Sequence, residues 1–335
     1  MKNERSITGD ALSVNLPRRQ FLIKVGLGLG AAAALDPLSI INAAENTDLS
    51  VDALKDNRYF RFAVISDTHI IDEFYKGPES NQLDSESVFL TTQRLTSVRK
   101  FINDLSPPFE QVFVCGDFFH DYPSPDYDFY YKNRTRIDNA KELIDGFKMP
   151  VHVALGNHDY DVPRVSREMS QRLFKEKLKI EPYYSVNYKG YKFIILNNFL
   201  GTTWDQSSKD YNKQIGSYGE TQLNWFEAEL KARMPTFIFQ HYPLYNMKEV
   251  EVTDYGILPL LKKYQDTIQI FFSGHWHRWF DFAKTYGPQH YTVASTRYDE
   301  DNYMLVEVDT KTKTWKILNH NCLEWATRNS IAYKP

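Results

Sequence analysis

The sequence has few of the residues and runs that define several large classes of protein. Its 335 residues include only two cysteines, which excludes a disulfide-stapled scaffold and a cysteine-based metal cluster. Glycine and proline number 15 each, too few for a collagen-like or low-complexity chain. No apolar run reaches the roughly 20 residues that cross a hydrocarbon core, so we expect no stable membrane span. What is present, 42% hydrophobic and 25% charged residues, is typical of a globular protein.

The chain also lacks an excess of positive charge. It carries 40 Lys and Arg against 43 Asp and Glu, a net charge of -3. Without residues 1–44 the balance becomes 35 basic against 40 acidic residues. General nucleic-acid binders have the opposite balance, so nucleic acid is an unlikely partner, although a local basic patch would not show in these totals. Aromatic residues reach 15%, which predicts aromatic-lined surfaces as well as an aromatic core.

The first 44 residues have the pattern of a cleaved export signal. Arg18 and Arg19 precede an uncharged stretch rich in Gly and Ala, residues 25–35, and small residues follow up to Ala44. The arginine pair, followed by any residue and then Phe-Leu, resembles the twin-arginine signal. The alternative is a chance arginine pair before a buried helix, which the interspersed glycines disfavour. The resemblance implies the twin-arginine export machinery as a partner, and a periplasmic or secreted bacterial protein.

The rest of the chain alternates between strand and helix patterns in one domain, residues 59–322. A polar lead-in, residues 45–58, precedes it, and a tail, residues 323–335, follows it. Short apolar runs predict strands at 61–65, 111–115, 151–155, 236–240 and 268–272. Helical spacing predicts helices at 86–105, 136–147, 221–232 and 256–264. A hairpin at 183–197 and strands near 290–295, 303–308 and 314–318 complete the prediction.

The β-α-β-α-β order of residues 61–155 predicts an α/β protein with parallel strand pairing and right-handed crossovers. Two polar, aromatic segments, 121–135 and 199–219, are expected to form loops around a site. Cys115 lies in an apolar run and should be buried, whereas Cys322 lies near the end of the chain. The sequence leaves open whether these two cysteines pair.

Five short polar motifs each follow a predicted strand. They are Asp67-Thr68-His69, Gly116-Asp117-Phe118-Phe119-His120, Gly156-Asn157-His158-Asp159, Gln240-His241 and Gly274-His275-Trp276-His277. Because ligands gather beyond the carboxyl ends of parallel strands, all five motifs could meet in one place. Two residues that are two apart, such as Asp67 and His69, point to the same side of an extended backbone. Imidazole with carboxylate and amide oxygen is a ligand set for Mn, Fe or Zn.

Each motif taken alone also has an ordinary structural explanation. Gly-Asp after a strand is usually a turn, and Gly-Asn-His-Asp could be a hairpin or a helix cap. His241, which precedes Tyr-Pro, is more often structural than catalytic in such a context. The order of the five motifs along one chain is what favours a shared functional site.

The ordered set resembles the pattern of the calcineurin-like metallophosphoesterase superfamily: Asp-x-His, Gly-Asp, Gly-Asn-His-Asp/Glu, His and Gly-His-x-His. The resemblance implies a four-layer α/β/β/α sandwich of two mixed sheets, with the metal site at the carboxyl ends of the strands. It also implies two divalent or trivalent metal ions, Mn, Fe or Zn. The first ion would be held by Asp67, His69 and His277, the second by Asn157, His241 and His275, and Asp117 would bridge both.

The same resemblance implies a phosphoesterase that hydrolyses small phosphodiesters or phosphomonoesters by attack of a metal-bridging hydroxide, and the amino-terminal pattern adds that it is exported. His158 would be the catalytic proton donor or a phosphate contact. His120, where purple acid phosphatases have a tyrosine, is similar to a histidine of the DNA-repair nuclease branch and would help to bind phosphate, or it is a loop residue without a role. Trp276 and Tyr242 would stack on a substrate base or sugar, or simply pack in the core. The alternative functions are an exported nuclease and a non-catalytic metal-binding protein of this fold.

Overall fold

The computed structural model describes residues 58–320. The predicted signal at 1–44, residues 45–57 of the predicted lead-in, the predicted tail and Cys322 all lie outside the described residues, so these parts of the interpretation stay predictions. Between residues 58 and 320, no helix combines the length and the hydropathy needed to cross a membrane.

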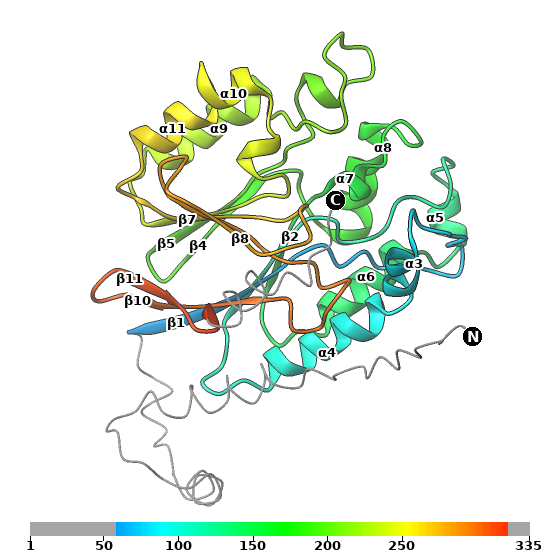
Figure 1. The fold of residues 1–335 in the computed structure, drawn as a ribbon, viewed down its shortest axis with the longest axis horizontal. Helices are drawn as coiled ribbons and strands as arrows, with labels where there is room; N and C mark the ends of the chain where they lie inside the picture. Colours follow the sequence, from blue (N-terminus) through cyan, green and yellow to red (C-terminus); the bar gives the residue numbers. More distant parts are fainter. Residues whose placement is uncertain (1–57, 321–335) are drawn as a thin grey trace, which may run out of the picture. The chain divides into compact units, whose positions relative to one another are not determined.

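The described chain forms two mixed sheets that pack against each other (Figure 1). The first contains β1 (Tyr59–Ile65), β2 (Gln111–Cys115), β3 (Val151–Ala154), β10 (Met304–Asp309) and β11 (Thr314–Ile317), in the order β11-β10-β1-β2-β3. In this sheet β1, β2 and β3 pair in parallel, as the sequence predicts, and β10 pairs antiparallel to β1. The second sheet contains β4 (Tyr184–Tyr188), β5 (Tyr191–Ile195), β6 (Thr236–Phe239), β7 (Ile268–Ser273), β8 (Phe280–Ala283) and β9 (Gln289–Thr292), in the order β4-β5-β6-β7-β9-β8.

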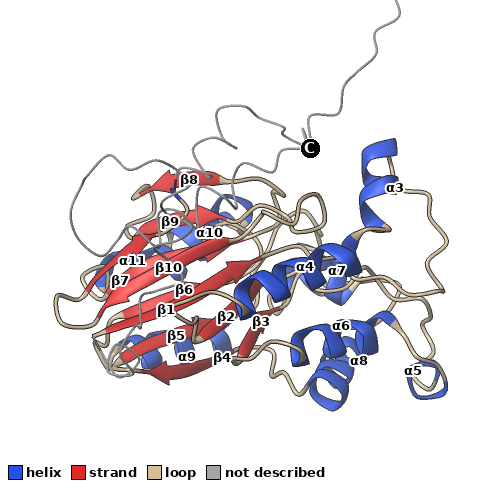
Figure 2. Cartoon of the chain, turned by 90° about the horizontal axis from the view of Figure 1, so that it is seen from below, coloured by secondary structure: helices blue, strands red, loops and turns tan. Residues whose placement is uncertain are grey.

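Helices cover the outer faces of the two sheets. Figure 1 shows α4 (Thr91–Asn103) and α6 (Arg136–Asp145) on one side, and α9 (Glu220–Leu230), α10 (Glu249–Thr253) and α11 (Ile257–Lys263) on the other. This is the α/β/β/α sandwich that the sequence predicts. The other helices are α3 (Gln82–Val88), α5 (Phe129–Lys132), α7 (Asn157–Tyr160) and α8 (Arg167–Leu173). Figure 2 shows α5, α7 and α8 grouped at one end of the strands.

The core between the sheets is built mainly from phenylalanine. Phe62 and Phe113 of the first sheet and Phe193 and Phe239 of the second are completely buried. The rings of Phe113 and Phe239 stack across the interface, with their centroids 4.0 Å apart. Large flat side chains that interlock in this way hold one sheet against the other in a single arrangement. The strand ends of the two sheets therefore keep fixed positions relative to each other.

One predicted helix is wrong in its extent. Instead of one helix over 86–105, the chain forms α3 and α4 with a break at Phe89 and Leu90. Phe89 is 66% exposed, so this apolar residue does not belong to the buried face that the helical spacing suggested. The buried face consists of Leu95, Val98 and Ile102, all on α4. The spacing of apolar residues was therefore a valid signal only from residue 91 onward.

Candidate metal centre

The carboxyl ends of five strands meet at one edge of the sandwich, and every predicted ligand follows one of them. The ligands Asp67 and His69 follow β1, Asp117 follows β2, Asn157 follows β3, His241 follows β6, and His275 and His277 follow β7. β1, β2 and β3 are parallel to one another, as are β6 and β7, so within each sheet their ends lie at the same edge.

A first cluster consists of Asp67, His69, Asp117 and His277, each with one ligand atom within 4.8 Å of the others. Nε2 of His277 lies 3.1 Å from Oδ1 of Asp67 and 3.3 Å from Nε2 of His69. Asp67 and His69 are fully buried, and Asp117 is 1% exposed. Two imidazole nitrogens and two carboxylates that face one point suit Mn, Fe or Zn.

A second cluster consists of Asp117, His241 and His275, again within 4.8 Å of one another. Nε2 of His241 lies 3.0 Å from Oδ1 of Asn157, which brings the predicted amide ligand to the same place. Asp117 belongs to both clusters through one atom. Its Oδ2 lies 3.6 Å from Nε2 of His69 and 3.2 Å from Nε2 of His241. A carboxylate oxygen in this position can bridge two cations.

The backbone at these ligands is unusual. Five of the seven have backbone φ values between 46° and 70°, a region that residues other than glycine seldom adopt. These five are Asp67, His69, Asp117, His275 and His277. Backbone hydrogen bonds join the loops that follow β1 and β2 and help to hold this conformation there. The N–H of Asp67 donates to the carbonyl of Gly116, and the N–H of His69 donates to the carbonyl of Asp117. Each such residue costs on the order of 1 kcal/mol, and unfavourable conformations of this kind cluster at functional sites.

Two glycines allow the loops to approach this closely. A Cβ atom on Gly156 would lie 2.1 Å from Oδ1 of Asp117, and one on Gly116 would lie 2.4 Å from Nδ1 of His241. Both distances are far below van der Waals contact. Gly116 also has a φ of 85°. Larger residues at these two positions would push the bridging carboxylate and His241 out of place.

The electrostatics of the clusters suit bound cations. Burial lowers the pKa of His69 and of His275 well below the ordinary value, so both rings are neutral and can offer a lone pair. Burial would raise the pKa of Asp117, but His241 lowers it and the carboxyl group stays charged. For His241, burial lowers the pKa, as it does for His69 and His275. The negative charge of Asp117 outweighs this effect and raises the pKa of His241 to about 9. A metal ion beside Asp117 would take over the role of that proton.

His158, the predicted proton donor, lies at the start of α7 beside the bridging carboxylate. Its backbone N–H donates to Oδ1 of Asp117 at 2.9 Å, and its side chain is 31% exposed. Nδ1 of the ring lies 2.7 Å from Oδ1 of Asp121. Burial lowers the pKa of His158, but Asp121 and Asp117 raise it, to about 10. With Nδ1 bonded to Asp121, Nε2 is the other nitrogen of the ring that could act on a substrate.

Asp121 was not among the predicted site residues. The predicted catalytic residue of this loop was His120, three residues after Asp117. Here the carboxylate comes one residue later, and the φ of 54° at Asp121 turns it back toward His158. A search for an acidic residue at either position would have found it.

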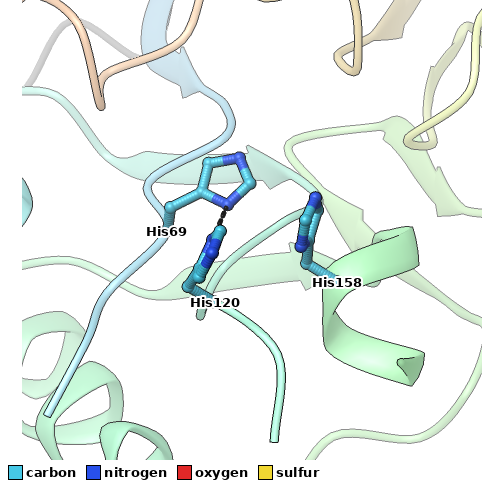
Figure 3. A group of neighbouring side chains, drawn as sticks. All are labelled: His69, His120 and His158. Atoms are coloured by element: carbon cyan, nitrogen blue, oxygen red, sulfur yellow. Dashed lines mark hydrogen bonds between the residues drawn. The ribbon is translucent and has the colours of Figure 1, made fainter. Parts of the chain in front are cut away.

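His120, the other predicted catalytic residue, contacts His69 rather than an open surface (Figure 3). Its Nδ1 lies 3.0 Å from Nδ1 of His69, and its Nε2 lies 3.1 Å from Oε1 of Glu79. The ring stacks on that of His158, with centroids 4.8 Å apart, and the side chain is 6% exposed. Both ring nitrogens are therefore engaged, and the predicted phosphate contact would require one of these bonds to break. No sequence signal pointed to Glu79.

The two predicted substrate residues differ in their surroundings. Tyr242 is 1% exposed, its ring centroid lies 4.1 Å from that of His275, and its hydroxyl donates to a backbone carbonyl. This burial argues against a stacking contact between Tyr242 and a substrate. Trp276 is half-buried, its Nε1 donates to Asn246, and its ring lies against that of the exposed Tyr245. The predicted substrate contact of Trp276 stays a prediction.

A cavity of about 490 Å³ lies away from these clusters. It is lined by His152, Tyr184 and Ile180, among others, at the start of β3. The predicted ligand Asn157 follows the other end of that strand, so the cavity is separate from the candidate metal centre.

Comparisons with known proteins agree with this geometry. A family model described as calcineurin-like phosphoesterase matches residues 60–279, a range that contains all seven predicted ligands. No curated protein sequence matches the chain. A dimetal phosphatase from Danio rerio has a similar fold, with a TM-score of 0.54 and 17% identity, over 74% of this chain and 92% of that chain.

Two further solved structures align with TM-scores of 0.45. A purple acid phosphatase from yellow lupin (Lupinus luteus) is 15% identical, over 77% of this chain and 53% of that chain. A calcineurin-like phosphoesterase from Bacillus subtilis is 13% identical, over 82% of this chain and 98% of that chain. At such identities these likenesses concern the fold alone.

Proposed function

This chain belongs to the calcineurin-like phosphoesterase family, and we propose that it is an exported dinuclear-metal enzyme that hydrolyses small phosphodiesters or phosphomonoesters. The observation that carries the proposal is the position of one atom, Oδ2 of Asp117. It lies 3.6 Å from Nε2 of His69 and 3.2 Å from Nε2 of His241, between the two clusters. A carboxylate oxygen in this position could serve as a shared ligand for two adjacent cations, the arrangement that two-metal hydrolysis uses.

The chain's own residues supply the remaining chemistry. When bound, the two cations, which we propose to be Mn, Fe or Zn, would offset charge on the phosphoryl oxygens and lower the pKa of an attacking water. His158 would donate a proton from Nε2 to the leaving alkoxide or to a phosphate oxygen. Asp121 would hold the ring of His158 in the correct orientation by accepting from Nδ1. Asp117 would also hold His158 beside the two metal sites, because Oδ1 of Asp117 accepts the backbone N–H of His158.

Small esters fit better than nucleic acid. The net charge of -3 opposes the binding of a long polyanion. The alternative of a nuclease drew on the resemblance of His120 to a nuclease histidine, and that support weakens because both ring nitrogens of His120 are bonded within the protein. A phosphodiester or monoester of a small molecule needs no extended basic surface.

The full-length chain loaded with Mn²⁺ should hydrolyse bis(p-nitrophenyl) phosphate or p-nitrophenyl phosphate, and a chelator should abolish the rate. The cause is the loss of the cations that offset phosphoryl charge. A faster rate on the diester would identify a phosphodiesterase, and a faster rate on the monoester a phosphatase. Protein that holds two ions per chain and turns over neither ester would contradict the proposal and favour a metal-binding role. Salt-sensitive binding and cleavage of single-stranded DNA would favour the nuclease.

The export part of the proposal has its support in the amino-terminal sequence. Replacement of both Arg18 and Arg19 by lysine should keep the protein in the cytoplasm of a bacterial host, because twin-arginine signals are recognised through that pair. Cell fractionation followed by immunoblotting measures the distribution, with Lys24→Arg as a control that preserves the charge. Equal export of the double variant and the wild type would show that the assigned route is wrong.

A further inference from the structure

Three side chains in series lead away from the first cluster. His69 turns Nε2 toward the cluster, 3.3 Å from Nε2 of His277, and turns Nδ1 toward His120. The two Nδ1 atoms of His69 and His120 are 3.0 Å apart, and Nε2 of His120 lies 3.1 Å from Oε1 of Glu79. Figure 3 shows the bond between His69 and His120, with the ring of His158 beside them but outside the series.

The proton positions along this series follow from which atoms can donate. A carboxylate only accepts, so Nε2 of His120 donates to Glu79, and Nδ1 of the neutral His120 ring is left as an acceptor. His69 must then donate from Nδ1. Its Nε2 is consequently unprotonated and faces the cluster, which is the tautomer that a metal-binding imidazole requires.

Glu79 is fixed in this role by its other contacts. It also accepts from the hydroxyl of Tyr75 and from Nη2 of Arg297 at 3.2 Å. Arg297 is 3% exposed and is held in turn by Ser87, whose hydroxyl accepts from Nε, and by the backbone carbonyl of Asp84. Burial would raise the pKa of Glu79, but the hydrogen bonds from His120 and Tyr75 hold it below the ordinary value.

The backbone of His120 is held just as firmly. Its N–H donates to the carbonyl of Ile70 at 3.0 Å, and its carbonyl accepts from Nη1 of Arg136. Arg136 forms a buried ion pair with Asp72, with side chains 3% and 2% exposed. The ring of His120 therefore has little freedom to turn its Nε2 from Glu79 toward a substrate.

We propose that Glu79 and His120 are positioning residues, which fix the proton of His69 on Nδ1 and so raise the metal affinity of the first cluster. The inference deepens the proposed function. It shares with that proposal one premise, that the first cluster binds a metal. The same geometry assigns His120 no contact with the substrate, because Glu79 and His69 occupy both of its ring nitrogens.

Two substitutions of His120 form a matched test. Asparagine has an amide atom where imidazole has Nδ1, so His120→Asn can still accept from His69 but loses the bond to Glu79. Glutamine has its amide atom where imidazole has Nε2, so His120→Gln can still reach Glu79 but offers His69 no acceptor. We expect Mn²⁺ affinity at one of two sites to fall about 10-fold or more in His120→Gln, and less in His120→Asn.

Glu79→Gln should also weaken Mn²⁺ binding at that one site by about 10-fold, because it removes the charge that orders the series. Glu73→Gln is the control, an exposed carboxylate of the same loop, and should leave both affinities unchanged. Isothermal titration of the metal-stripped full-length chain measures both affinities and the stoichiometry, and thermal unfolding without metal reports whether each variant folds.

The outcomes separate this inference from the proposed function. Wild-type Mn²⁺ affinities at both sites in Glu79→Gln and His120→Gln would overturn it. So would a third bound ion that the His120 variants lose, since His69, His120 and His158 have nitrogens within 4.8 Å and would then form a metal site themselves. If Glu79→Gln does not fold, the comparison of the two His120 variants decides. A lower Mn²⁺ affinity in His120→Gln than in His120→Asn would support the inference, and the reverse order would overturn it. The variants could bind Mn²⁺ more weakly while the wild-type protein hydrolyses no ester. This result would support the inference and contradict the proposed function.

Discussion

Asparagine at position 117 should cost the protein both metal ions and, with them, all measurable turnover. Oδ2 of Asp117 faces both clusters, and a neutral amide there would leave two adjacent cations without the anion that lies between them. The change keeps the size of the side chain and an oxygen that can accept from the N–H of His158. The fold should therefore survive, and elemental analysis of the purified variant should find less than one ion per chain.

The matched control is the same substitution four residues later. Asp121→Asn removes a carboxylate from the same loop, but one that bonds to His158 instead of facing a cluster, so its metal content should stay near two ions per chain. Retention of two ions by Asp117→Asn would show that Asp117 does not bridge them, and the assignment of the dinuclear centre would have to change.

Alanine in place of His158 should lower kcat about 100-fold or more and leave the metal content near that of the wild type. His158 lies beside the clusters, 31% exposed, and its backbone N–H rather than its ring contacts Asp117. Removal of the ring therefore takes away the proton donor without removing a metal ligand. Steady-state kinetics on the preferred p-nitrophenyl ester, together with elemental analysis of the same sample, measures both quantities.

Asp121→Asn should show a smaller loss of kcat in the same assay, about 10-fold, because the ring of His158 remains but is less well oriented and less readily charged. Asp128→Asn, in an exposed part of the same loop, should behave like the wild type. Loss of metal from His158→Ala would show that His158 supports metal binding. The assignment of His158 as the proton donor would then be wrong.

Much of the fold could be predicted because its signals are local. The strands β1, β2 and β3 are short apolar runs, and the helices between them force parallel pairing, so the motifs that follow these strands had to meet at one edge. The seven predicted ligands were recognisable for the same reason: each lies within a few residues of a strand end. The break between α3 and α4 was missed because an exposed Phe89 continued the apolar spacing of the buried face.

The supporting residues Glu79 and Asp121 were missed because their roles depend on contacts that form only in the folded chain. Glu79 lies in a polar loop without periodicity, and its importance arises only where that loop meets His120. Asp121 directly follows His120, to which the resemblance gave a role, and its contact with His158 joins residues 37 apart in the chain. Tyr242, in contrast, was predicted as a substrate contact because it follows the predicted ligand His241, and its burial becomes visible only once the neighbouring loops are in place.

The sequence by itself determined the ligand types, their order and the strands that carry them, since these follow from patterns spanning a few residues. Tertiary structure alone decided which oxygen of Asp117 faces both clusters, which nitrogen of His69 faces the metal site, and that His120 turns toward Glu79. These choices depend on contacts between residues far apart in the chain, such as His69 with His120, 51 residues away, and with His277, 208 residues away. The aromatic core supplies the physical reason, because it holds the two sheets in one arrangement and so determines which side chains meet at their common edge.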